Sequence, residues 1–265
     1  MGLLFTGTEK WDILVCSKGR RNKQVKIALV TGASGVIGSA CAQALAREGY
    51  ALALQYHRHG ERAEALVSQL PAETAFYLHT ADISQKKDVC GLYRAIEQHL
   101  GRVDLLVNCA GLSLPQEVLT DVSEEDMDRL YAVNVKGAML LTQGAIPHML
   151  QKEGGSIVHV SSMWGITGGS CEAVYSATKG ALNAFVKAMA KELAPSHIRV
   201  NAVAPGLVPS PMNASLTEKD LAAFREDTPL GQLVAPEQVA QAVCYLAQAQ
   251  MVTGQILSVD GGIVI

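Results

Sequence analysis

The sequence predicts an α/β protein with a single doubly wound domain, in which about seven parallel strands carry helices on both faces. Three observations predict this fold. Short apolar segments alternate with segments of helical periodicity along most of the chain. The chain has 265 residues, 49% of them hydrophobic, which is enough for one large core. Aromatic residues make up only 5%, as close packing of helices on a parallel sheet requires.

Charge and cysteine content exclude several classes of protein. The formal net charge is −3, so no overall positive field attracts nucleic acid. No apolar segment approaches the length that spans a membrane, and residues 13–16 are too short for the core of a signal peptide. The six cysteines show no CxxC spacing and no grouping with histidines that indicates a metal site. We therefore expect reduced thiols, no metal and a cytoplasmic location.

Residues 1–24 differ from the rest of the chain, because 18–23 are polar and mostly basic. Such a tail could bind an acidic partner or nucleic acid. We interpret it instead as a poorly ordered N-terminal extension and place the folded domain at 25–265.

The first strand and the first helix are joined by a glycine-rich turn. An apolar strand at 26–30 leads into TGASGVIG at 31–38, and a helix follows at 39–49. This order is typical of a dinucleotide-binding unit, whose loop amides face the pyrophosphate. Gly32 permits the tight turn, and Gly38 lets the helix pack close to the strand. The cofactor contacts predicted here are Gly32, Ser34, Gly35, Ile37 and Gly38.

The second strand, 51–56, ends without the carboxylate that usually grips the ribose 2′-hydroxyl of NAD. Arg58 follows it instead, and a guanidinium group suits a 2′-phosphate. We therefore predict that the cofactor is NADPH and that Arg58 contacts its phosphate. The alternative is that Arg58 is a solvated loop residue.

The alternation continues to the end of the chain. Further strands are predicted within 73–84, 103–111, 155–162, 198–206 and 255–262. Further helices are predicted at 86–101, 123–150 and 175–193. Ser123 and Asp126 have the spacing of a capping box. In such a sheet the binding site gathers at the carboxyl ends of the strands.

Three residues suited to proton transfer lie at the end of one of these strands and in the helix that follows it. Ser162 follows the strand, and Tyr175 and Lys179 are four residues apart, which places them on one face of a helix. An ammonium group beside a phenol lowers the pKa of the phenol, and a serine hydroxyl can hold a carbonyl oxygen. Together they could interconvert C=O and CH–OH. The alternative is a plain helix start with a buried tyrosine and a solvated lysine.

From residue 26 to 265 the chain resembles a short-chain dehydrogenase/reductase of the classical type, a family with a Rossmann fold. The matching motifs are TGASGVIG, Asp82, NCAG at 108–111, Asn134, Ser162, Tyr175, Lys179 and PG at 205–206. The resemblance implies that Tyr175 is the general acid, that Lys179 also binds the nicotinamide ribose, and that Asn134 holds a water. It implies further cofactor contacts at Asp82, Ile83, Asn108, Ala110, Gly111, Tyr175, Lys179, Pro205 and Gly206. It also implies a homotetramer or homodimer.

The chain departs from the family pattern at Val36, where the pattern TGxxxGxG has glycine. A valine does not readily adopt a positive φ, and it adds bulk near the pyrophosphate. We expect either that Gly35 takes the flexible role or that cofactor affinity suffers. The basic residue that NADPH enzymes often carry at position 35 is also absent, so Arg58 carries more of the phosphate recognition.

Within the family the chain resembles the 3-oxoacyl-carrier-protein reductases overall. Segments 161–185 and 211–231 resemble the elongation factor P 5-aminopentanone reductases, which act on a ketone carried by a modified lysine. Glu172 could pair with the amine of such a ketone, or it is a solvated loop carboxylate. Trp164 is either a wall of the substrate site or a loop anchor. Glu153 lies where a positive charge would help to dock an acidic carrier protein.

The segment 207–230 follows a strand end, carries Pro209 and Pro211 near its start, and continues into a short amphipathic helix. Thr217 is the expected N-cap of that helix, with Asp220 in its first turn. We predict that this segment is a lid that closes over the nicotinamide and, with Trp164 and Glu172, defines the substrate pocket. The sequence thus favours an NADPH-dependent ketone reductase; the alternative is a non-catalytic NADP(H)-binding sensor or scaffold.

Overall fold

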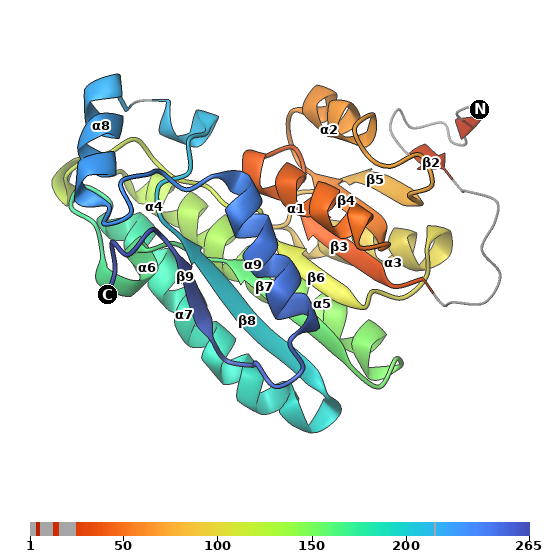
Figure 1. Ribbon diagram of the computed structural model, residues 1–265. Coiled ribbons are helices and arrows are strands. Elements are labelled where there is room, and N and C mark those ends of the chain that lie inside the picture. The colour runs from red at the N-terminus through yellow and green to blue at the C-terminus, as the bar shows by residue number, and fades with distance from the viewer. Residues whose placement is uncertain (1–3, 6–12, 16–24, 215) are drawn as a thin grey trace.

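The structure, a computed structural model, describes residues 4–5, 13–15, 25–214 and 216–265. Its centre is one sheet with the strand order β1-β2-β5-β4-β3-β6-β7-β8-β9 (Figure 1). The seven parallel strands are β3 (Ile27–Thr31), β4 (Ala51–Tyr56), β5 (Phe76–Thr80), β6 (Leu105–Asn108), β7 (Gly155–Val160), β8 (Ile198–Pro205) and β9 (Ile256–Val259). The predicted fold class is confirmed.

Helices cover both faces of the sheet (Figure 1). Alternate side chains of a strand point to opposite faces, so Ala28 and Val30 join one hydrophobic cluster and Ile27 and Leu29 the other. The first cluster includes residues of α1 (Val36–Arg47), α2 (Gly60–Val67) and α9 (Pro236–Gln248). The second includes residues of α3 (Lys86–His99), α5 (Ala138–Leu150) and α7 (Ala173–Leu193). Burial on both faces explains why the central strands β3 and β4 are largely apolar.

The helical stretch predicted at 123–150 is not one regular helix. It consists of α4 (Glu124–Tyr131), the π-helical segment η2 (Ala132–Gly137) and then α5. The Ser123 hydroxyl accepts a hydrogen bond from the Asp126 amide at 3.1 Å, so Ser123 caps α4 as predicted. The remaining short elements are η1 (Leu119–Asp121), α6 (Trp164–Thr167), η3 (Ala194–Ser196), η4 (Pro211–Asn213) and α8 (Glu218–Asp227). The sequence did not predict α2, α6 or α9.

The sheet also extends beyond its predicted edge. Within the N-terminal extension, β1 (Leu4–Phe5) pairs antiparallel with β2 (Ile13–Val15), and β2 pairs antiparallel with β5. These two strands are part of the sheet, although the whole extension was expected to lie outside the fold. The poor order expected of residues 1–3, 6–12 and 16–24 concerns positions outside the described residues.

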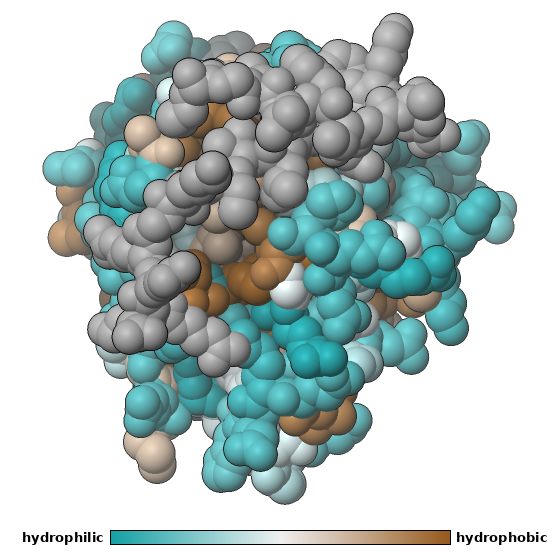
Figure 2. All heavy atoms as spheres, turned by 90° about the vertical axis from the view of Figure 1, so that its right-hand side faces the viewer, coloured by the Kyte–Doolittle hydropathy of each residue, from teal (hydrophilic) through white to brown (hydrophobic). Residues whose placement is uncertain are grey.

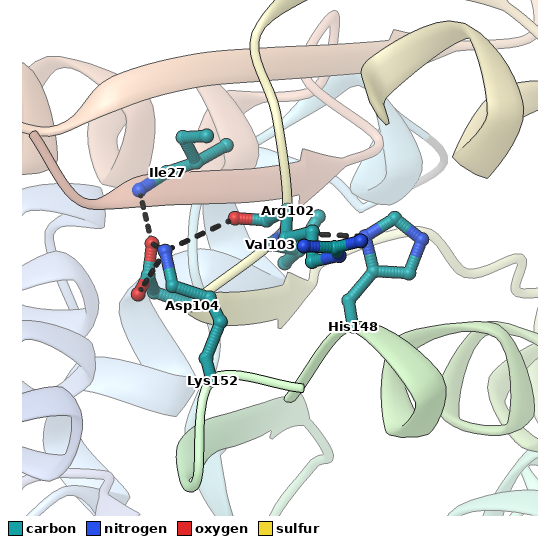
Figure 3. Close-up of polar contacts among 6 residues, drawn as sticks. All are labelled: Ile27, Arg102, Val103, Asp104, His148 and Lys152. Carbon is teal, nitrogen blue, oxygen red and sulfur yellow. Dashed lines mark hydrogen bonds and ion pairs between the residues drawn. The ribbon is translucent and has the colours of Figure 1, made fainter. Parts of the chain in front are cut away.

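Polar groups are paired at the amino edge of the sheet, where the parallel strands begin (Figure 3). The Asp104 carboxylate accepts hydrogen bonds from the Ile27 amide and from the Lys152 ammonium group, both at 2.7 Å. His148 Nδ1 accepts a hydrogen bond from the Val103 amide at 3.3 Å, and burial lowers the pKa of His148. These bonds tie β3, β6 and the end of α5 together, on the side of the sheet away from the carboxyl ends.

Among the residues that Figure 2 colours by hydropathy, most of those seen from the right-hand side of Figure 1 are hydrophilic, with smaller hydrophobic patches between them. None of the described helices is both long and apolar enough to span a membrane. The five cysteines among the described residues form no disulfide. Within the same part of the chain, no cluster of His, Cys, Asp or Glu could hold a metal ion.

Candidate active site

A cavity of about 140 Å³ opens at the carboxyl edge of the sheet, beyond the ends of β6, β7 and β8. The predicted site residues that line it are Ile37, Gly111, Ser162, Trp164, Glu172, Tyr175, Lys179, Pro205 and Gly206. The other predicted site residues follow the ends of β3 to β6 or lie beside the cavity without lining it: Gly32, Ser34, Gly35, Gly38, Arg58, Asp82, Ile83, Asn108, Ala110 and Asn134. The structure thus brings the proposed proton-transfer residues and both proposed substrate residues to one cavity.

Ser162, Tyr175 and Lys179 meet because a strand end faces a helix. Ser162 follows β7, whereas Tyr175 and Lys179 lie one turn apart on α7. A hydrogen bond links the side chains of Ser162 and Tyr175. Lys179 Nζ lies 5.6 Å from the centroid of the Tyr175 ring. Lys179 is only 5% exposed, and burial lowers its pKa to about 8.

The pKa of Tyr175 is shifted opposite to the prediction. Burial raises it to about 12; the hydrogen bond with Ser162 opposes this rise, and the Glu172 carboxylate adds to it. Lys179 was expected to bring the pKa of Tyr175 down, but burial outweighs every opposing influence and the net shift is upward. The Lys179 ammonium group donates a hydrogen bond to the Val160 carbonyl at 2.9 Å. Tyr175 therefore keeps its proton at neutral pH, which is the state that a proton donor needs.

Asn134 supports the cavity wall from η2. Its Oδ1 accepts a hydrogen bond from the Leu112 amide at 2.8 Å, and its Nδ2 donates to the Leu112 carbonyl at 2.9 Å and to Thr178 Oγ1 at 3.1 Å. Space is limited here, since a Cβ on Gly111 would lie 3.4 Å from Asn134 Oδ1 and 3.5 Å from Lys179 Nζ. A π-helical turn at such a position is often functional. That Asn134 holds a water stays a prediction.

The glycine-rich turn between β3 and α1 fits a dinucleotide. Gly32 has a φ of +65°, and a Cβ there would lie 2.9 Å from backbone atoms of Ala110. A Cβ on Gly38 would lie 2.2 Å from the Gly32 carbonyl oxygen. The turn leads into the N-terminus of α1, whose first amides have no partner within the helix and attract an anion. The turn can therefore form this anion-binding site only with glycine at positions 32 and 38.

Val36 causes no backbone strain, because it is the first residue of α1 and its φ is not positive. Gly35 has a φ of −86°, so it does not take the flexible role considered for it, and Gly32 has the positive φ instead. The concern about strain at Val36 was therefore wrong. Its effect on cofactor affinity stays a prediction.

The comparisons with known proteins agree with this geometry. The family model described as Enoyl-(Acyl carrier protein) reductase matches residues 32–264. The chain belongs to the short-chain dehydrogenase/reductase family. It is 40% identical over 238 residues to the 3-oxoacyl-[acyl-carrier-protein] reductase of Homo sapiens, covering 90% of this chain and 98% of that protein. It is 39% identical over 246 residues to the 3-oxoacyl-[acyl-carrier-protein] reductase FabG of Thermotoga maritima, covering 91% and 98%.

A solved structure of a reductase also matches this chain in fold and sequence. The 3-ketoacyl-(acyl-carrier-protein) reductase from Brucella melitensis, complexed with NADH, superimposes with a TM-score of 0.85 at 33% identity, covering 92% of this chain and all of that one. As a short-chain dehydrogenase/reductase of the 3-oxoacyl-carrier-protein reductase type, the protein is an oxidoreductase of carbonyl and alcohol groups that depends on a nicotinamide cofactor.

In this short-chain dehydrogenase/reductase, Arg58 lies beside the glycine-rich turn. The Ser34 hydroxyl donates to the Arg58 carbonyl at 3.1 Å, and the side chain of Arg58 is exposed. Asp82 follows β5 and accepts a hydrogen bond from the Ser84 amide at 2.9 Å. Burial acts to raise the pKa of Asp82, but hydrogen bonds from Ser84 and the charge of His57 outweigh it, so the pKa is lowered. Asp82 is therefore a charged hydrogen-bond acceptor just after the end of β5.

Trp164 and Glu172 form part of the cavity wall. Trp164 begins α6, and it also packs on the loop, since a Cβ on Gly169 would lie 2.8 Å from its ring. Trp164 therefore anchors the loop and also lines the cavity, and its contact with a substrate stays a prediction. Glu172 is the residue before α7, is only partly exposed and lines the cavity. Burial raises its pKa, while a hydrogen bond with Gln116 lowers it. No salt bridge to Glu172 is found among the described residues.

Sequence reasoning missed several parts of the cavity. The irregular segment after NCAG lines it with Leu112, Ser113, Leu114 and Gln116. The segment 207–230 was expected at the pocket as a whole, and the structure identifies its lining residues as Leu207, Val208, Ser210, Met212, Asn213, Leu216 and Phe224. Thr217 is the N-cap of α8 and Asp220 lies in its first turn, as predicted. The structure adds a full capping box, in which the Thr217 amide donates to Asp220 at 2.8 Å. No motif marks residues 112–116, because only the path of the chain brings them to the site.

Proposed function

We propose that this protein is an NADPH-dependent ketone reductase in which Tyr175 donates the proton and Ser162 orients the carbonyl oxygen. The observation that supports the proposal is the shared cavity, which Ser162, Tyr175 and Lys179 line together. A bound nicotinamide supplies the hydride. The raised pKa of Tyr175 keeps its phenol protonated until the carbonyl oxygen takes up the proton. The charge of Lys179 then stabilises the phenolate that remains.

The test is to mix the protein with NADPH and an activated ketone and to follow the absorbance of the reduced nicotinamide. Loss of absorbance that depends on the ketone supports a reductase. Tight NADPH binding without oxidation by any ketone would favour the non-catalytic sensor or scaffold instead. The complete set of Asn134, Ser162, Tyr175 and Lys179 favours the enzyme.

NADPH is proposed because Arg58 lies beside the cofactor turn and no carboxylate follows β4. The change Arg58→Ala should weaken NADPH binding by about 1.5–3 kcal/mol, the range for a hydrogen bond to a charged group. NADH has no 2′-phosphate, so its affinity should change little. Dissociation constants from nicotinamide fluorescence measure both effects. Equal losses for the two cofactors, or no loss, would show that Arg58 is only a solvated loop residue.

For the substrate we propose an amine-bearing ketone, namely the 5-aminopentanone group on a modified lysine of elongation factor P. Support comes from Glu172, a cavity carboxylate without a salt bridge among the described residues. Burial raises the pKa of Glu172, because a buried carboxylate loses contact with water. A cationic amine beside it would compensate for that loss by stabilising the negative charge. Mass spectrometry of elongation factor P, from cells with and without this protein, tests the proposal. An unchanged modification mass would refute it.

The second candidate is reduction of 3-oxoacyl groups on acyl carrier protein. It is supported by the names of the human and Thermotoga maritima relatives. Such a substrate has no amine, so it needs no carboxylate in the cavity. It is delivered by an acidic carrier. Glu153, considered above as a docking residue, lies just before β7 at the amino edge of the sheet, away from the cavity, so it does not weigh against this candidate.

The change Glu172→Gln separates these two substrates. If Glu172 binds an amine, the change should lower kcat/KM for a ketone bearing a primary amine by about tenfold or more, the loss expected for a charge-assisted hydrogen bond. A neutral ketoester should be reduced as before, and it serves as the control. Equal responses of both substrates would contradict amine recognition and favour the acyl carrier protein reductase.

We further propose that residues 207–230 act as a lid over the bound nicotinamide. Support comes from Met212, Leu216 and Phe224, which line the cavity from this segment. We also propose that the protein works in the cytoplasm as a homotetramer or homodimer, in line with the family resemblance. Native mass spectrometry tests the assembly.

A further inference from the structure

His159 is a buried polar residue that the proposed chemistry does not use. It lies on β7 immediately before Val160, whose carbonyl holds Lys179, and three residues before Ser162. Its exposed fraction is 0%, and Phe185 packs edge-on against its ring with the centroids 6.1 Å apart. A buried imidazole is costly unless its nitrogens are paired, and here both are.

The hydrogen bonds around His159 decide which ring nitrogen carries the proton. The Thr31 hydroxyl donates to Asn108 Oδ1 at 2.7 Å, so the amide nitrogen of Asn108 faces His159 and donates to Nδ1 at 3.2 Å. The Thr142 hydroxyl donates to the Ala138 carbonyl at 2.9 Å, so it accepts from His159 Nε2, 3.2 Å away. A neutral imidazole with its proton on Nε2 satisfies every one of these bonds.

A charged ring at this place is strongly disfavoured. Burial lowers the pKa of His159 to about 3, and the charge of Lys179 acts in the same direction. Protonation of Nδ1 would also turn it from an acceptor into a donor facing the Asn108 amide nitrogen. His159 is therefore neutral at neutral pH.

The ring connects the strand ends that carry the site. Thr31, Asn108 and His159 are neighbours in one row across β3, β6 and β7. The glycine-rich turn follows Thr31, and the cavity residue Cys109 follows Asn108. On β7 the residue after His159 is Val160, whose carbonyl accepts a hydrogen bond from Lys179. Ser161 and Ser162 follow it. A shift of β7 against β6 would therefore move the reacting side chains relative to the turn.

We propose that His159 is a positioning residue for carbonyl reduction, whose neutral ring holds the ends of β6 and β7 in place so that Ser162 and Lys179 meet Tyr175. The inference rests on the proposed roles of these three residues, but not on which ketone is reduced. Thr142 belongs to α5, so the same ring also fixes the sheet to the helix that covers this face.

Two substitutions at this position test the proposal. His159→Phe keeps a ring but loses both hydrogen bonds, so kcat with an activated ketone should fall by roughly 10²-fold, the loss that a misplacement of about 1 Å causes. The affinity for NADPH should change far less, because the turn keeps its own bonds to Gln55. His159→Asn places an acceptor near the Nδ1 position and should recover most of the kcat.

His148→Phe is the matched control, because His148 is also buried and accepts a hydrogen bond, but at the amino edge of the sheet. It should lower the melting temperature and leave kcat unchanged. If His148→Phe and His159→Phe lower kcat alike, or if His159→Phe keeps the wild-type kcat, the proposal fails. If His159→Phe does not fold, Thr142→Val removes one partner of the ring and is judged by the same comparison.

A spectroscopic measurement tests the hydrogen bonds without any ketone. The ¹⁵N chemical shifts of His159 should show a protonated Nε2 and an unprotonated Nδ1 between about pH 5 and 8. The opposite tautomer, or titration in this range, would overturn the inference. Because this result does not require turnover, it separates failure of the positioning role from failure of the proposed function.

Discussion

Replacing Tyr175 by phenylalanine should lower kcat by roughly 10²–10⁴-fold, the contribution of a general acid. The ring remains, so the packing of α7 against the cavity is kept, and only the proton donor and its hydrogen bond with Ser162 are lost. NADPH affinity should therefore stay nearly unchanged. Steady-state kinetics with an activated ketone, together with a fluorescence titration of NADPH, measures the two quantities on the same preparation.

The change Lys179→Ala should act differently from Tyr175→Phe. It removes the charge next to Tyr175 and the predicted contact with the nicotinamide ribose, so both kcat and NADPH affinity should fall. It also removes the bond to the Val160 carbonyl, and a melting curve must show that the fold survives. Substantial turnover by Tyr175→Phe would refute the mechanism, whatever Lys179→Ala does.

Gly38→Ala should disrupt the cofactor turn. Its Cβ would lie 2.2 Å from the Gly32 carbonyl oxygen and 3.1 Å from the Ala33 Cα, and backbone atoms cannot rotate away as a side chain can. We expect the free energy of unfolding to fall by about 1–3 kcal/mol, the usual cost of overpacking. NADPH affinity should fall by more than about tenfold, because the loop amides that face the pyrophosphate must shift.

Gly91→Ala is the control for this change. Gly91 lies within α3, and a Cβ there meets no atom within 4 Å. Because alanine is the better helix former, this variant should be more stable by about 0.5–1 kcal/mol and should bind NADPH as the wild type does. Thermal melts and NADPH titrations of both variants give the comparison. Unchanged affinity in Gly38→Ala would mean that the turn does not form the cofactor cradle.

The sequence alone was sufficient for the fold class and for the proposed proton-transfer residues that line the cavity. The central strands β3 and β4 could be predicted because burial on both faces leaves them as largely apolar runs. The pairing of Tyr175 with Lys179 could be predicted because a spacing of four fixes their relation on any helix. Gly32 and Gly38 could be identified because a tight turn and a close helix contact both exclude a side chain.

Properties that depend on distant segments were decided only by the tertiary structure. The pKa of Tyr175 rises instead of falling, because burial outweighs the influences that oppose it. The π-helical segment at Asn134 accompanies bonds to Leu112 and Thr178, which are remote in the sequence. The row from Thr31 through Asn108 to His159 exists only once β3, β6 and β7 are aligned. Desolvation and hydrogen bonds between segments depend on three-dimensional distances, and the local pattern of a sequence does not contain them.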